Sequence, residues 1–197
     1  MIKVKKNGFT LIELLAVIVI LGIISTIAVP QVTGYIEKSK RSAFVQMANS
    51  YVDSVNASIT SEVFDAPVEE NDVTIVNIDM IELDKESINS PYGSPWVVQK
   101  SYVAVVNEGT AIEPQYAYYF AGQDEDRNAI PLTKISEITE KSVTNEARNT
   151  MEVTVQSLTG NIAGNESEKG IISGLDNIKD KNGNKIDWKA KIYTNKN

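Results

Sequence analysis

Lys5-Lys6-Asn7-Gly8-Phe9-Thr10-Leu11-Ile12-Glu13 begins the most informative stretch of this sequence, and an apolar run continues from it to Pro30. Residues 9–29 contain a single charged side chain, that of Glu13. At about 1.5 Å per residue, a helix of this length covers roughly 30 Å, the thickness of the hydrocarbon core of a bilayer. The stretch therefore predicts a membrane-spanning helix. The three lysines before it predict an N-terminus on the cytoplasmic side.

Two ordinary interpretations compete for this segment. One is a secretory signal cut after Ala28, because Thr26-Ile27-Ala28 resembles a small-residue cleavage site, and the other is an uncleaved anchor. The apolar run is longer than the 7–15 residues typical of a secretory signal. A carboxylate in hydrocarbon is also unfavourable by a few kcal/mol, so Glu13 is a functional candidate that needs a partner. Both observations argue against the two ordinary interpretations.

Residues 5–13 resemble the prepilin motif of type IV pilins and pseudopilins. The resemblance implies that residues 1–8 are a leader, cut by a prepilin peptidase between Gly8 and Phe9, and that the new amine of Phe9 is methylated. It also implies that Glu13 pairs with the N-terminal amine of a neighbouring subunit. The implied partners are other pilin subunits, minor pilins included, the peptidase and methyltransferase, a membrane assembly platform, and lipid before assembly. The implied location is the cytoplasmic membrane, in a single pass, and then an extracellular pilus.

Gly22 and Pro30 are the helix-breaking residues of the apolar segment, which we take as residues 9–30. Pro30 lies at the outer membrane boundary, where its missing N–H is tolerated. One interpretation of the two residues is simply a kink at the membrane surface. The family resemblance implies instead that the segment between them loosens when the helix enters a filament.

Residues 31–65 change from uniformly apolar to amphipathic, which predicts that the same helix continues and packs against a sheet. The predicted stripe repeats at three- and four-residue steps and comprises Phe44, Met47, Ala48, Tyr51, Val52, Val55, Ile59 and Val63. We expect the helix to end between Phe64 and Pro67.

Residues 66–197 alternate short apolar runs with turn signals, which predicts an α+β head with an antiparallel sheet, as in the pilin fold. The predicted strands are Val73–Ile78, Trp96–Val106, Gln115–Ala121, Met151–Leu158 and Ile186–Tyr193. Short helices are expected within Asp79–Ser87 and Thr133–Asn149.

Two segments of the head could carry more than structure. Ser90-Pro91-Tyr92-Gly93-Ser94-Pro95-Trp96 reads as a rigid turn, and it resembles the Asp-Pro-Trp-Gly-Asn-Pro-Tyr turn of major pseudopilins, with Ser90 in place of the aspartate. Asp124, Glu125 and Asp126 form an acidic loop that we expect to be solvated, with a weak calcium site as the alternative.

Composition narrows the function further. The net charge is −7, from 19 basic and 26 acidic side chains, and such an acidic chain is a poor match for nucleic acid. Cysteine and histidine are both absent, which excludes disulfides, thiolate metal sites and the usual general base at neutral pH. We expect no cofactor, no bound metal and no enzymatic activity. Three functions stay open: a pilin used for adhesion, motility or aggregation, a pseudopilin of a type II secretion or DNA-uptake system, and a membrane-tethered binding protein that does not assemble. The resemblance to type IV pilins implies a Gram-positive type, because many Gram-negative pilins close a C-terminal loop with a disulfide and this head has no cysteine.

Overall fold

The computed structural model describes residues 8–69, 72–81, 89–145, 178, 183, 184, 186 and 188–193. The chain divides into two compact units, residues 1–39 and 40–197. One helix, α1 (Leu11–Thr60), begins in the first unit and ends in the second. Both Gly22 and Pro30 lie inside α1, so neither ends it.

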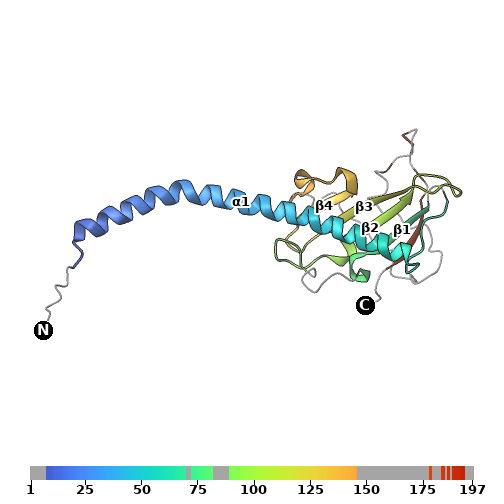
Figure 1. The fold of residues 1–197 in the computed structure, drawn as a ribbon, viewed down its shortest axis with the longest axis horizontal. Helices are drawn as coiled ribbons and strands as arrows, with labels where there is room; N and C mark the ends of the chain where they lie inside the picture. The colour runs from blue at the N-terminus through green and yellow to red at the C-terminus, as the bar shows by residue number, and fades with distance from the viewer. Residues whose placement is uncertain are drawn as a thin grey trace. The chain divides into compact units, whose positions relative to one another are not determined.

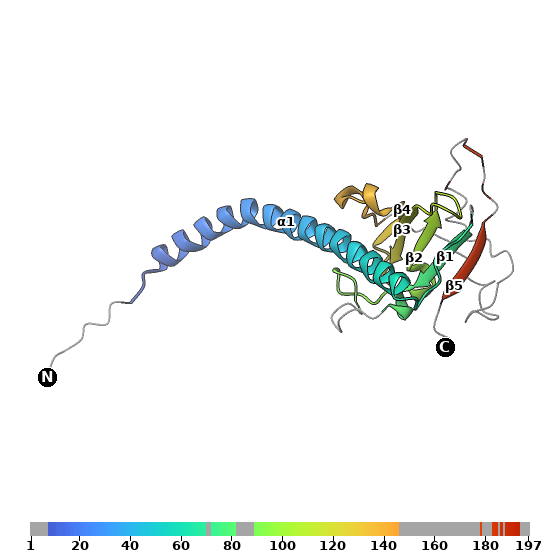
Figure 2. The same ribbon diagram turned by 45° about the vertical axis from the view of Figure 1, so that its right-hand side comes forward.

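The second unit is built on a five-stranded sheet in the order β4-β3-β2-β1-β5 (Figures 1 and 2). The strands are β1 (Asp72–Asn77), β2 (Tyr102–Asn107), β3 (Tyr116–Gln123), β4 (Ala129–Lys134) and β5 (Lys189–Tyr193). Neighbouring strands β1 to β4 pair antiparallel, whereas β5 lies parallel to β1 at the other edge. The expected α+β fold is thus confirmed, but the sheet is mixed rather than wholly antiparallel.

The C-terminal part of α1 packs on one face of this sheet (Figure 1). The side chains that α1 buries there are Phe44, Ala48, Tyr51, Val52, Val55 and Ile59. They follow the predicted stripe because residues three and four apart share one face of a helix. Of the other two predicted members, Met47 is half-buried and Val63 is exposed.

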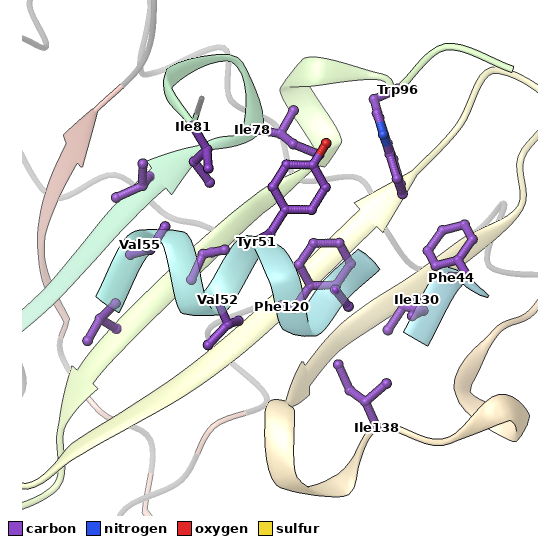
Figure 3. Packing of buried hydrophobic residues seen from close by; sticks show 14 of the residues in the cluster. Phe44, Tyr51, Val52, Val55, Ile78, Ile81, Trp96, Phe120, Ile130 and Ile138 are labelled. Carbon is purple, nitrogen blue, oxygen red and sulfur yellow. The ribbon is translucent and has the colours of Figure 1, made fainter. Parts of the chain in front are cut away.

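Aromatic rings occupy the centre of this interface (Figure 3). The ring of Phe44 meets Trp96 edge-on at 5.0 Å between centroids, and Tyr51 stacks on Phe120 at 6.1 Å. Near the end of α1, the Tyr118 hydroxyl donates to Asn56 Oδ1 at 2.6 Å. Tyr51 contacts Phe120, and Asn56, which comes later in α1, contacts Tyr118, which comes earlier in β3, so β3 runs antiparallel to the packed part of α1.

The helix ends at Thr60, earlier than expected, in a Schellman motif. The amide of Glu62 donates to the Ile59 carbonyl at 3.0 Å, and the amide of Val63 donates to the Ser58 carbonyl at 2.8 Å. Glu62 takes a left-handed φ of 59° to close the motif. Glycine usually occupies this position, so a glutamate there does not indicate a helix end.

Other predicted elements of the head are corrected as follows. Predicted strand 96–106 is interrupted by the 3₁₀ turn η3 (Val98–Lys100), so that only its second half forms β2. Within 133–149, where short helices were expected, the described residues hold the end of β4 and two 3₁₀ turns, η4 (Ile135–Glu137) and η5 (Glu140–Ser142), and residues 146–149 lie outside the described residues. Short helices were also expected within 79–87. The structure describes only residues 79–81 of this segment: the first two end the 3₁₀ turn η1 (Ile78–Met80), and Ile81 follows it. Predicted strand 151–158 lies outside the described residues.

Candidate functional site

The predicted cleavage site lies in exposed, non-helical chain immediately before α1. Gly8, Phe9 and Thr10 all precede the first helical residue, Leu11, and all three are exposed. No other atom lies within 4 Å of the position where a Cβ of Gly8 would stand, and the Phe9 side chain is 87% exposed. The Gly8–Phe9 bond is therefore open to a peptidase. The lysines of the leader lie outside the described residues.

Glu13 lies in the first turn of α1 and exchanges hydrogen bonds with Thr10. The amide and the hydroxyl of Thr10 each donate to Glu13 Oε2 at 2.8 Å. In return, the amide of Glu13 donates to the Thr10 hydroxyl oxygen at 3.3 Å. This is a capping box, which satisfies two of the amides that a helix N-terminus leaves without intrahelical partners. The glutamate of the motif thus also starts the helix.

Thr10 is the site residue that the motif alone did not reveal. Its signal in the sequence is a threonine three residues before a glutamate, at the start of an apolar run. The Thr10 amide belongs to the peptide that joins it to Phe9, so the carboxylate of Glu13 already lies beside the residue that a cut after Gly8 would leave at the N-terminus.

Beyond this turn, α1 presents an almost continuous apolar surface. The side chains from Leu11 to Val32 are exposed within the chain. Within the described part of the chain, α1 is the helix that is long and apolar enough to cross a membrane. Exposed apolar surface of this extent needs lipid or another protein to cover it.

Threonine side chains support the backbone around Gly22 and Pro30. The Thr26 hydroxyl donates to the Gly22 carbonyl at 2.9 Å, and the Thr33 hydroxyl donates to the Pro30 carbonyl at 2.9 Å. These bonds give the threonine hydroxyl groups a partner within the helix itself, as an apolar environment requires. Loosening of this segment during assembly stays a prediction.

Residues 3–29 match the family described as the prokaryotic N-terminal methylation motif. The chain carries a type IV prepilin signal. This signal leads directly into α1, whose C-terminal part packs on a mainly antiparallel sheet, so the fold is pilin-like. The motif supports a type IV pilin-like protein, either a pilus or a pseudopilus component. No curated protein and no solved structure matches the chain.

The acidic loop of the head differs from expectation, because its first carboxylate is buried. Asp124 is fully shielded and accepts hydrogen bonds from the Ser90 hydroxyl at 2.6 Å and from the Asn128 amide at 2.8 Å. Glu125 and Asp126 are exposed. Asp126 accepts a bond from the Ser94 hydroxyl, so both ends of the 90–96 turn are tied to this loop. Within the described residues, no group of three or more acidic, histidine or cysteine side chains could hold a metal ion.

Proposed function

We propose that this chain is the structural subunit of a type IV pilus of the Gram-positive type. The observation that carries the proposal is the continuity of the prepilin signal with α1, an exposed apolar helix that ends in a folded head. A peptidase cut after Gly8 removes the leader lysines but retains the whole apolar helix. The helix then holds the subunit in the membrane until it joins other subunits in a surface filament used for adhesion, motility or aggregation.

In this proposal Phe9 and Glu13 set the position of each subunit along the filament. Cleavage creates an ammonium group on Phe9, which is methylated, and the carboxylate of Glu13 is its opposite charge. A buried ion pair contributes little net stability but fixes register well, because an unpaired charge in an apolar setting is strongly unfavourable. In the free subunit the Thr10 amide and hydroxyl occupy Glu13 Oε2. In the filament, the N-terminal amine of a neighbouring subunit supplies the positive charge that pairs with the Glu13 carboxylate.

A Glu13→Gln variant tests this role, with Glu37→Gln on the same helix as the matched control. Removing one partner of a buried pair is unfavourable by about 3–5 kcal/mol, so we expect at least about tenfold fewer sheared filaments. Cleavage should continue, and mass spectrometry should find a mature protein that starts at methylated Phe9. Normal filament yield with Glu13→Gln, or a mature N-terminus near Val29, would contradict the proposal.

The second candidate is a pseudopilin, which shares the prepilin signal. It is favoured by the 90–96 turn, which resembles that of major pseudopilins except at Ser90. Electron microscopy of filaments sheared from cells separates the two functions. Long surface filaments containing this chain indicate a pilus, whereas cell-bound material that appears only with a secretion or DNA-uptake system indicates a pseudopilus.

A further inference from the structure

The apolar surface of α1 ends within the first compact unit, at the turn that holds Tyr35 and Ile36. Between Glu13 and Glu37 no side chain carries a formal charge, and Lys38 follows Glu37 directly. The side chains of Tyr35 and Ile36 are both exposed, that of Tyr35 at 75%. The surface of the helix therefore changes from apolar to charged within about one turn of Tyr35.

Distances along the helix axis place Tyr35 in the polar layer at the surface of a bilayer. From Leu11, the first helical residue, to Pro30 the axis rises by roughly 30 Å, which equals the thickness of the hydrocarbon core. Tyr35 lies about 7 Å further along, and the polar layer on each side of the core is roughly 5–8 Å thick. When the apolar part of α1 fills the core, the ring of Tyr35 thus lies between the acyl chains and the lipid headgroups.

The residues just before Tyr35 suit the same level. Gln31 and Tyr35 are one helical turn apart, so their side chains share one face of α1, and both are exposed. Between them, the Thr33 hydroxyl donates to the carbonyls of Val29 at 3.1 Å and Pro30 at 2.9 Å, so this hydroxyl does not need lipid or water as a partner. The polar face that this turn offers to lipid is thus that of Gln31 and Tyr35, whose amide and hydroxyl both donate and accept hydrogen bonds.

We propose that Tyr35 anchors α1 in the polar layer of the outer leaflet, with its ring against the upper acyl chains and its hydroxyl on the ester and phosphate oxygens of lipid. Tyrosine suits this layer because its ring is apolar while its tip forms hydrogen bonds, and it is enriched at both surfaces of membrane proteins for this reason. The anchor continues the apolar surface of α1, the helix that is long and apolar enough to cross a membrane, so one bilayer covers both.

An anchor at this level also fixes how deep Glu13 lies in the bilayer. Because Glu13 and Tyr35 belong to one continuous helix, they stay about 33 Å apart along its axis. With Tyr35 in the outer polar layer, Glu13 lies just inside the inner boundary, whereas a carboxylate is most unfavourable at the bilayer centre. This inference rests on the proposed function, since it concerns the subunit held in the membrane before assembly, and it identifies the residue and the lipid layer that hold the subunit there.

Fluorescence quenching in vesicles tests this depth, because the chain has no native cysteine and can carry a single probe. The full chain with Ile36→Cys is labelled with a fluorescent dye and reconstituted in vesicles of phosphatidylcholine and phosphatidylglycerol. The dye should be quenched more by lipids spin-labelled near the headgroup than by lipids spin-labelled near the end of the acyl chain. Val29→Cys should show the opposite order, and Ser39→Cys, beyond the membrane surface, should be quenched little by either lipid.

Variants at position 35 separate anchoring from mere proximity to the membrane surface. Tyr35→Ala should change the shallow-to-deep quenching ratio of the Ile36→Cys probe at least about twofold, because α1 is then free to shift along the membrane normal, whereas Tyr35→Trp should keep the ratio. Val32→Ala, which removes an apolar side chain about one turn away, is the matched control and should leave the ratio unchanged. An Ile36→Cys probe that neither lipid quenches, or a ratio that Tyr35→Ala does not change, would overturn the anchor and leave the membrane helix standing. A Val29→Cys probe that neither lipid quenches would instead contradict the proposed function, which requires α1 to lie in the bilayer.

Discussion

Thr10 and Glu13 form reciprocal hydrogen bonds at the first turn of α1, at 2.8 Å from each Thr10 donor to Glu13 Oε2 and at 3.3 Å in return. The carboxylate expected to pair between subunits therefore already has two donors in the free chain. This arrangement lowers the penalty of keeping Glu13 in an apolar setting before assembly.

The first prediction concerns that turn. Thr10→Ala should loosen the start of α1, because the loss of an N-cap side chain destabilises a helix by about 1 kcal/mol, whereas Thr10→Ser should retain the box. Hydrogen exchange of the amides of residues 11–14, measured on the full chain in detergent micelles, checks this. Equal protection in the alanine and serine variants would show that the hydroxyl is unimportant.

The second prediction concerns the end of the same helix. Glu62 has a φ of 59°, a backbone conformation that is unfavourable by about 1 kcal/mol for residues other than glycine. Glu62→Gly should therefore raise the midpoint of thermal unfolding by a few degrees, while Glu62→Ala should not. Since Glu62 is exposed, loss of its side chain removes no packing. A lower midpoint for the glycine variant would contradict this account of the Schellman motif.

The third prediction follows from the buried Asp124. An aspartate at position 90, as in the resembling pseudopilin turn, would place a second carboxylate where the Ser90 hydroxyl donates at 2.6 Å. Two carboxylates this close cannot both ionise without strong repulsion. Ser90→Asp should destabilise the head by several kcal/mol, and Asp124→Asn should restore much of that loss. Additive effects in this double-mutant cycle would show that the two positions are not coupled.

The fourth prediction concerns a clasp formed by Asp65, Lys191 and Tyr193, which joins β5 to the segment after α1. Asp65 is paired with Lys191, and the Tyr193 hydroxyl donates to Asp65 Oδ2 at 2.7 Å. Lys191 and then Tyr193 lower the pKa of Asp65 below its usual value, and Asp65 raises the pKa of Lys191. The contribution of Asp65 is complete above its unfolded pKa of about 3.9 and is lost as pH falls through the lower folded value. That of Lys191 is complete below its unfolded pKa of about 10.4 and is lost as pH rises through the raised one.

Thermal unfolding of the full chain and of Lys191→Met should thus differ by a constant amount near neutral pH. The difference should be small, because the pair is largely exposed. It should shrink below about pH 4 and again at strongly alkaline pH, as each charge disappears. Lys100→Met, at an unrelated position on the head, provides the control. A difference that does not change with pH would mean that Lys191 acts through packing alone.

The sequence predicted the helix and the prepilin motif well because both depend on local patterns, while cleavage, methylation and the role of Glu13 stay predictions. Apolar length and a three- and four-residue stripe define α1, and the motif around Gly8 and Glu13 is contiguous. The strands β1 and β3 were predicted because each is a short apolar run bounded by turn residues. The parallel pairing of β5 with β1 depends on distant parts of the chain, and no local pattern encodes it.

The features that the sequence did not predict have equally specific causes. The strand β4 contains Pro131, which argues against a strand unless it lies at a sheet edge, and β4 is an edge strand. Glu62 closes the helix in a conformation usually taken by glycine, so no residue in the sequence indicates that α1 ends at Thr60. Burial of Asp124 depends on Ser90, which is 34 positions away. The sequence showed three adjacent acids, and only the tertiary structure separates the buried one from its exposed neighbours.

The position of β5 also governs when the head can finish folding. Its residues pair with β1 although the two strands are more than a hundred residues apart in the sequence. Such distant pairings form slowly, because the conformational entropy of closing a long loop is lost before the hydrogen bonds and contacts between the strands can form. Until residues 189–193 have been synthesised and released, one edge of β1 lacks its partner, and an open edge invites pairing with other chains. Completion of this sheet is thus a late event in biogenesis, and a subunit truncated before β5 would be prone to aggregate.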